Sequence, residues 1–243
     1  MIVALMSTYR EGNLALAAAR SVLPACDALV LYEGAVGEPA AGGDPTPVGP
    51  IDAACAAVDV RYWHEEGEWE TDAGKRTALL ELATEVLWGG ESDAKEPFWC
   101  FWIDGDEIML WPEYLPDYCA RAEHVGGAGG FPLRIVEFDG SVAQAHGRVF
   151  RGDKVARFLE GSYQVELHGG MVVALPNEKI CDAGGVPYST EIVKLEHLAE
   201  LRPPLAGEPH ILHRWPLRSP ERQAARLHAA EPGWYDQANT KET

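Results

Sequence analysis

Short apolar segments alternate with polar loops and longer amphipathic segments along the first half of the chain. Four segments have the length and composition of strands: residues 1–6, 28–32, 58–63 and 98–103. Helices are expected between them, from about residue 14 to 23 and from residue 75 to 87. Residues 34–50 are rich in Gly, Pro and Ala without periodicity, which predicts a surface loop. This alternation of strands and helices is typical of a parallel α/β sheet.

The second half has a different pattern, in which short strands are separated by connections that contain glycine. Strands are expected at residues 131–138, 145–150, 163–168 and 171–175, several of them antiparallel. A helix is expected at residues 113–123, and Ser219-Pro220 predicts the start of a C-terminal helix that runs to about Ala230. The whole pattern therefore predicts an α/β protein with a mixed sheet.

The most distinctive segment lies where these two patterns meet. Residues 98–103 are apolar, aromatic and uncharged, which predicts a central strand buried on both faces. Asp104, Gly105, Asp106 and Glu107 follow, at the end of the strand where open α/β sheets bind ligands. Two carboxylates separated by one glycine can face a single point, and the glycine lets a phosphate oxygen approach the backbone. Such oxygen ligands suit Mg²⁺ or Mn²⁺ shared with phosphates. The alternative is a polar turn that closes a core strand.

Length, charge and cysteine content limit the possible classes. The chain has 243 residues and 47% hydrophobic content, so we expect one domain over residues 1–243. A formal net charge of −18 argues against a broad cationic face for nucleic acid or anionic lipid. We find no membrane-length apolar stretch and no signal-peptide pattern, so a soluble, cytoplasmic protein is expected. The five scattered cysteines predict reduced thiols.

A carboxylate also follows the second predicted strand. If this strand pairs in parallel with the first, Glu33 lies beside the polar loop that contains Thr8, Tyr9 and Arg10. A carboxylate at that position commonly accepts hydrogen bonds from a ribose or a base. In the alternative interpretation, Glu33 only solvates a loop.

Two cations open the helix predicted at residues 75–87. Lys75 and Arg76 follow Thr71 and Asp72, either of which is a plausible N-cap. Cations at the start of a helix oppose its dipole, at a cost of a few tenths of a kcal/mol unless an anion is bound. Together with the N–H groups of the first turn, Lys75 and Arg76 form a candidate site for a diphosphate. The alternative is a solvated helix edge.

The order of these motifs over residues 1–112 resembles the GT-A glycosyltransferases, particularly family 2. The resemblance implies a Rossmann-like, nucleotide-sugar-binding half at residues 1–112 and an acceptor-side half at residues 113–243. It implies that Thr8, Tyr9, Arg10 and Glu33 hold the nucleotide, that Lys75 and Arg76 help to bind the diphosphate, and that Asp104 and Asp106 bind the metal.

The expected activity is metal-dependent transfer of a sugar from a nucleoside-diphosphate sugar, with a UDP-sugar as the expected donor and Mn²⁺ or Mg²⁺ as the cofactor. A metal and cations at the diphosphate stabilise the charge that grows there in the transition state. The acceptor is left open: a protein, a glycan, a small molecule or a modified nucleic-acid base. A metal-dependent phosphotransferase or hydrolase, and a non-catalytic nucleotide-sugar-binding module, remain alternatives, although we find no G-x-x-x-x-G-K-[ST] loop.

The second half supplies candidates for the remaining roles. An inverting enzyme needs a carboxylate that deprotonates the acceptor, and Glu137, Asp139 and Glu166 are the candidates. His213 is a candidate metal or phosphate ligand within residues 210–215. This segment lies between prolines and is expected either to close over the bound nucleotide or to pack as an edge strand.

Overall fold

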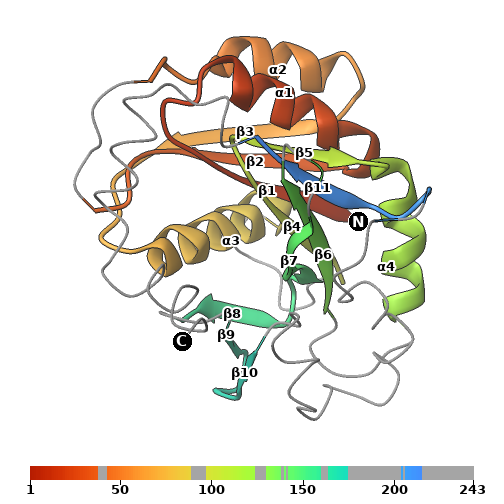
Figure 1. The fold of residues 1–243 in the computed structure, drawn as a ribbon. Coiled ribbons are helices and arrows are strands. Elements are labelled where there is room, and N and C mark those ends of the chain that lie inside the picture. The colour runs from red at the N-terminus through yellow and green to blue at the C-terminus, as the bar shows by residue number, and fades with distance from the viewer. Residues whose placement is uncertain are drawn as a thin grey trace, which may run out of the picture.

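The computed structural model describes residues 1–37, 43–88, 97–123, 130–137, 140, 142–159, 164–174, 204 and 206–214. A mixed sheet of eight strands runs through it in the order β3-β2-β1-β4-β7-β6-β11-β5, and a second sheet has the order β10-β9-β8 (Figure 1). The strands are β1 (Ile2–Thr8), β2 (Ala28–Glu33), β3 (Arg61–Glu66), β4 (Trp99–Asp104), β5 (Glu107–Leu110), β6 (Gly130–Glu137), β7 (Val142–Arg151), β8 (Val155–Phe158), β9 (Gln164–Leu167), β10 (Val172–Ala174) and β11 (His210–His213).

Helices cover both faces of the large sheet. The helices α1 (Asn13–Val22), α2 (Val48–Ala56) and α4 (Leu115–Glu123) bury apolar side chains in one core cluster. The opposite cluster contains α3 (Asp72–Trp88) and residues of β8 and β9 (Figure 1). Two 3-10 turns complete the described elements, η1 (Leu23–Ala25) and η2 (Pro112–Tyr114). We call the face under α1, α2 and α4 the first face, and the face under α3 the second face.

The alternation of side chains in the strands explains these two cores. In β1, Ala4 and Met6 belong to the first-face cluster, whereas Val3 and Leu5 belong to the second-face cluster. The segment expected to be a central strand is β4, which pairs in parallel with β1 and antiparallel with β7. Its apolar residues are all buried, as predicted for a strand covered on both faces.

Sequence periodicity failed at two places in the first half. Residues 48–50, expected to be loop, begin α2, which packs on the sheet through Ile51 and Cys55. The sequence did not predict this helix because Gly49 and Pro50 are typical of loops. Proline is nevertheless compatible with the first turn of a helix, where Pro50 lies. The third strand begins at Arg61 rather than at residue 58, because Asp59 has φ 59° and forms part of the turn after α2.

The second half contains some strands that the sequence pattern predicted and others that it did not. The antiparallel pairs β6–β7 and β9–β10 agree with the expectation. A third antiparallel pair joins β8 to β9. The short strands β5 and β8 were not anticipated. The predicted C-terminal helix from Ser219 lies outside the described residues. Of the cysteines, Cys26, Cys55, Cys100 and Cys119 are described, buried and free.

Candidate functional site

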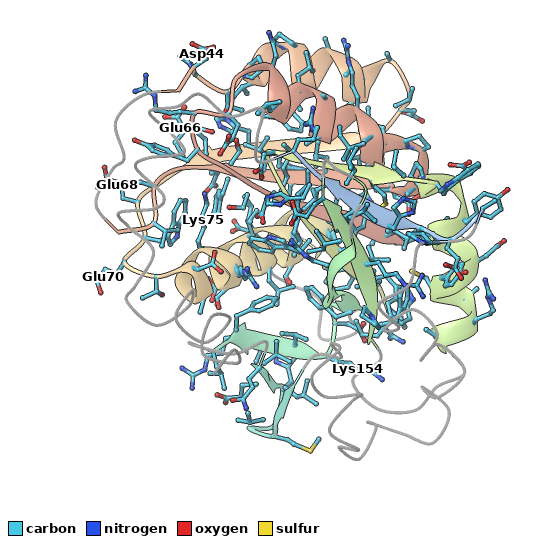
Figure 2. All side chains as sticks on the ribbon, viewed as in Figure 1. Asp44, Glu66, Glu68, Glu70, Lys75 and Lys154 are labelled. Atoms are coloured by element: carbon cyan, nitrogen blue, oxygen red, sulfur yellow. The ribbon has the colours of Figure 1, made fainter. Side chains whose placement is uncertain are left out.

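The parallel strands bring the predicted site residues to one edge of the sheet. Thr8 is opposite Glu33 in the β1–β2 pair, and Glu33 is opposite Glu66 in the β2–β3 pair. Asp104 is opposite Ser7 in the β1–β4 pair. Glu33 therefore lies beside the loop after β1, as the sequence predicted. Acidic side chains surround this edge in Figure 2, which labels Asp44, Glu66, Glu68 and Glu70 on the same side of the molecule.

Asp104 is the last residue of β4, and its carboxylate contacts the side chains of Trp102 and Arg148. The indole Nε1 of Trp102 donates to Oδ1 at 2.8 Å, and Nη1 of Arg148 lies 3.6 Å from Oδ2. Burial alone would raise the pKa of Asp104. The guanidinium groups of Arg148 and Arg76 outweigh burial and hold this pKa below its ordinary value. Asp104 is therefore a carboxylate at neutral pH.

Asp106 is the most buried carboxylate of the site, with 1% of its side chain exposed. Its Oδ2 lies 3.3 Å from Nε2 of His213, and its backbone oxygen accepts a hydrogen bond from the backbone N–H of Arg214. On the other side of the imidazole, Nδ1 of His213 lies 3.2 Å from Oε2 of Glu137. Burial would lower the pKa of His213, but Asp106, Glu107 and Glu137 together raise it. A carboxylate–imidazole–carboxylate arrangement thus connects the turn after β4 with β11 and β6.

Glu107 and Arg148 form a buried ion pair beneath these carboxylates. Nη2 of Arg148 lies 2.7 Å from Oε1 of Glu107, whose Oε2 accepts the backbone N–H of Asp104 at 2.8 Å. Burial raises the pKa of Glu107 to about 7, although Arg148 opposes the increase. The pair fixes the turn that carries Asp104, Gly105 and Asp106. Arg148 was not among the residues predicted for the site, and an arginine within the predicted strand at residues 145–150 was the signal for it.

Gly105 has a structural role that the sequence did not reveal. A Cβ atom at this position would lie 2.7 Å from Oγ1 of Thr8 and 2.8 Å from Cγ of Glu11. The space was predicted to admit a phosphate oxygen, but the protein's own side chains occupy it. Gly105 therefore lets the turn after β4 pack against the loop after β1.

Glu33 is bound by the protein itself. One carboxylate oxygen accepts the backbone N–H of Arg10 at 2.8 Å, and the other accepts the hydroxyl of Thr46. The Thr46 hydroxyl also lies 3.1 Å from that of Thr8. Arg10, with φ 54°, directs its guanidinium to the backbone oxygen of Gly43. Glu33 thus joins the loop after β1 to the segment before α2. Tyr9 is partly exposed beside it.

Lys75 lies in the site but does not present a free charge. Its side chain is buried, with Nζ donating to the backbone oxygens of Thr8 at 3.0 Å and Gly34 at 2.7 Å. Figure 2 shows it between the start of α3 and the sheet. Burial lowers the pKa of Lys75 to about 8, although Asp104 and Glu33 oppose the decrease. Diphosphate binding by Lys75 stays a prediction; the described contacts are those of a link between two loops.

The first turn of α3 supplies its own anion. Nη2 of Arg76 lies 2.7 Å from Oδ2 of Asp72, and its guanidinium carbon lies 4.7 Å from the ring centroid of Trp102. The backbone N–H of Gly74 donates to Oγ1 of Thr71, which makes Thr71 the N-cap residue. The conflict between cations and helix dipole is therefore relieved locally by Asp72.

The candidate bases lie in different parts of the chain. Glu137 contacts His213, as described above. Glu166 lies on β9 in the small sheet, with its Oε2 2.6 Å from Nη2 of Arg157. Asp139 lies outside the described residues. Among these three candidates, only Glu137 has a described contact with His213, which itself contacts Asp106.

The segment with His213 is not a mobile closing segment in its described part. Residues 210–213 form β11, which pairs in parallel with β6 and antiparallel with β5. The expectation of a lid is therefore wrong for these residues, and so is that of an edge strand, because β11 has partners on both sides. Trp215 lies outside the described residues. Arg214 donates from Nη2 to the backbone oxygen of Leu14 at 2.8 Å.

Comparisons with known proteins give no family assignment. A scan against protein-family models finds no match, and no curated protein matches the chain in sequence. Within the described residues, no helix is both long and apolar enough to cross a membrane. In this same part of the chain, no group of three or more His, Cys, Asp or Glu residues is arranged to hold a metal ion.

Proposed function

We propose that this chain is a metal-dependent glycosyltransferase of the GT-A type, which transfers a sugar from a nucleoside-diphosphate sugar, with a UDP-sugar as the expected donor. One observation carries the proposal: strand register places Thr8, Glu33 and Asp104 at neighbouring strand ends, and β11 adds His213 beside Asp106. An open α/β sheet binds ligands at this edge. The chain thus combines a position for a nucleotide with carboxylates of the type that binds a divalent cation, although, among the described residues, they are not arranged around a common point in this structure.

The charge at this edge supports a role for a metal. Asp104 is ionised and Asp106 lies two positions after it, so a bound cation would offset the repulsion between these carboxylates and a diphosphate. Carboxylate oxygens and an imidazole nitrogen are suitable ligands for Mn²⁺, and carboxylates for Mg²⁺. Asp104, Asp106 and His213 would hold the ion, which would stabilise the charge on the departing diphosphate. Glu137 would orient His213 through Nδ1, as carboxylates do for metal-bound histidines.

The chain's own residues then have separate tasks. Thr8 and Glu33 would position the nucleoside, and Arg148 would keep Asp104 ionised and aligned. Arg214 contributes positive charge close to Asp106, whose backbone oxygen it binds. Glu137, with 34% of its side chain exposed, is a carboxylate that an acceptor can reach from solvent. It is the candidate general base that the described contacts favour.

Nucleotide binding by Asp104→Asn and Asp106→Asn tests the proposal. Both changes remove ligand charge at nearly constant volume, and we expect Mn²⁺-dependent affinity for UDP to fall by about 10- to 100-fold. Asp117→Asn, in the exposed first turn of α4, is the matched control and should bind as the wild type does. Undiminished Mn²⁺-dependent binding in both site variants would overturn the proposal.

A panel of nucleotide sugars separates the alternatives by their products. A glycosyltransferase releases nucleotide at a rate that rises when an acceptor is supplied, and the sugar appears on that acceptor. A phosphohydrolase cleaves the donor without any acceptor, and a binding module leaves it intact.

A further inference from the structure

Two buried polar atoms on β3 have no hydrogen-bond partner among the described residues: the hydroxyl of Tyr62 and Nε2 of His64. Buried polar groups in proteins are almost always hydrogen-bonded, because each unsatisfied one costs about 1–3 kcal/mol. Both rings are otherwise partly buried. Two such atoms two residues apart therefore need an explanation, which an incoming ligand can supply.

Both side chains belong to the first face of the sheet. Tyr62 packs against the core cluster that contains Ile51 and Cys55 of α2. Because alternate strand residues share a face, His64 lies on the same side. Tyr62 is opposite Leu29 and His64 is opposite Leu31 in the β2–β3 pair, so both precede the row of Glu33 and Glu66 on that face.

The surroundings of Tyr62 connect it to the predicted nucleoside position. Burial raises the pKa of its hydroxyl, and the nearby carboxylates of Asp52 and Glu33 act in the same direction. Along β2, Glu33 lies four residues beyond Leu29, the partner of Tyr62, and therefore on the same face of the sheet. Tyr62, Glu33 and Thr8 thus follow one another from β3 to β1 on a single face.

The separation between this place and the acids of β4 matches an extended ligand. β2 and β1 lie between β3 and β4. Neighbouring strands are about 4.8 Å apart, so the two places are separated by roughly 14 Å across the sheet. Along the strands, Tyr62 also lies three residues, or about 10 Å, before the row of Asp104. An extended nucleoside diphosphate spans such a distance, with its ribose near Glu33 and its diphosphate at Asp104 and Asp106.

We propose that Tyr62 and His64 form the subsite for the base of the donor nucleotide, and that the base is uracil; this inference rests on the proposed function. Uracil presents carbonyl acceptors and one imide N–H donor. The Tyr62 hydroxyl can donate to a carbonyl, and Nε2 of His64 can accept the imide N–H. On entry, a ribose hydroxyl replaces the Thr46 hydroxyl on Glu33, which opens the segment before α2.

The test compares Tyr62→Phe and His64→Phe with the wild type in binding UDP, CDP, ADP, GDP and inorganic pyrophosphate, each with Mn²⁺. Each change keeps a ring but removes the polar atom. We expect UDP affinity to fall about 3- to 10-fold, as for one hydrogen bond, and the preference for UDP over the other nucleotides to decrease. Pyrophosphate affinity should not change, because pyrophosphate has no base.

Tyr32→Phe is the matched control, since the Tyr32 hydroxyl donates to Glu65 at 2.9 Å and its ring lies in the second-face cluster. It should leave the nucleotide ranking unchanged. Without ligand, the melting temperature of Tyr62→Phe should be equal to or above that of the wild type, because an unpaired hydroxyl is removed.

Three results would overturn the inference. If UDP affinity and the nucleotide ranking are unchanged in both site variants while the wild type binds UDP, the subsite is wrong but the proposed function survives. If Tyr62→Phe lowers the melting temperature and leaves the ranking unchanged, the hydroxyl binds an internal water instead. If the wild type binds no nucleotide with Mn²⁺, the proposed function and the subsite both fail.

Discussion

The two halves of the large sheet hold their polar groups in different ways. In the parallel half, β3-β2-β1-β4, Lys75 binds backbone oxygens and Glu33 binds a backbone N–H and a hydroxyl. In the other half, β7-β6-β11-β5, charged side chains pair with each other: Arg148 of β7 pairs with Glu107 of β5, and Arg134 of β6 pairs with Glu208, which precedes β11. The first half thus uses polar side chains to join its loops, whereas the second half uses ion pairs between residues far apart in sequence.

The largest effect is expected from breaking the most buried of these pairs. Nη1 of Arg134 lies 2.6 Å from Oε2 of Glu208, and their side chains are 1% and 7% exposed. Arg134→Ala leaves Glu208 as a buried charge, which should reduce the free energy of unfolding by about 3–5 kcal/mol. Urea denaturation measures this loss.

The exposed pair between Arg157 and Glu166 is the control for this comparison. Arg157 is 60% exposed in its side chain, so Arg157→Ala should cost at most about 1 kcal/mol. The double variant Arg134→Met, Glu208→Leu removes both buried charges and should recover most of the stability. A loss as small for Arg134→Ala as for Arg157→Ala would show that the second half does not depend on its buried charges.

A second prediction separates two roles of Glu137 in the proposed reaction. Glu137→Gln keeps an oxygen that accepts the Nδ1–H of His213 but loses basicity, so Mn²⁺-dependent UDP affinity should persist. If Glu137 is the general base, the transfer rate should fall by about 100-fold or more. Glu137→Ala should weaken UDP binding as well. Glu166→Gln, in the small sheet, is the control, and a greater rate loss there than in Glu137→Gln would reverse the assignment.

In the parallel half, Lys75→Met tests the link between two loops. The change removes both hydrogen bonds from Nζ and leaves two backbone oxygens without this donor, so we expect a loss of about 1–3 kcal/mol in unfolding free energy. If Lys75 also binds a diphosphate, affinity for pyrophosphate should fall more than affinity for uridine. Unchanged stability would mean that the loops are held by other contacts.

The pH dependence of Lys75 gives an effect with a definite sign. Burial lowers its pKa from the ordinary 10.5 to about 8. Between these two pH values the unfolded chain binds more protons than the folded chain at this residue, so stability rises with pH. The stability of the wild type relative to Lys75→Met should therefore increase from about pH 8 to pH 10.5. The difference between the two proteins removes the contribution of other groups.

Local sequence patterns were sufficient for most of the parallel half. The strand before Asp104 was predicted because six consecutive apolar residues fit only a strand buried on both faces. The position of Glu33 followed from parallel pairing of neighbouring strands. Helix α2 was missed because its contact with the core depends mainly on Ile51 and Cys55, too few positions for a periodic signal.

The half of the sheet formed by β7-β6-β11-β5 could not be predicted in the same way, because its contacts join residues far apart in the sequence. Arg148 meets Glu107 across 41 positions of sequence, and His213 meets Glu137 across 76. The residues 210–213 looked like a connector because four residues flanked by prolines and charges give no strand periodicity. Their place between β5 and β6 arises from strand pairing over a long distance, which is decided by the folded structure as a whole.

The smallest change is expected in β11 itself, on binding a nucleotide. Backbone pairing on both sides protects residues 211–213 from amide exchange, since these hydrogen bonds break only when the strand separates from β5 and β6. Amide exchange should therefore be slow in the free protein, and UDP with Mn²⁺ should slow it only slightly further.

The segment of residues 43–47 is the comparison within the parallel half, because Thr46 must release Glu33 before a ribose can bind there. Its exchange should respond to the ligand much more strongly than that of β11. The opposite result would be fast exchange of residues 211–213 in the free protein, with protection only when UDP and Mn²⁺ are both present. In that case residues 210–213 would act as a segment that closes over the nucleotide, and β11, rather than the segment with Thr46, would be the mobile part.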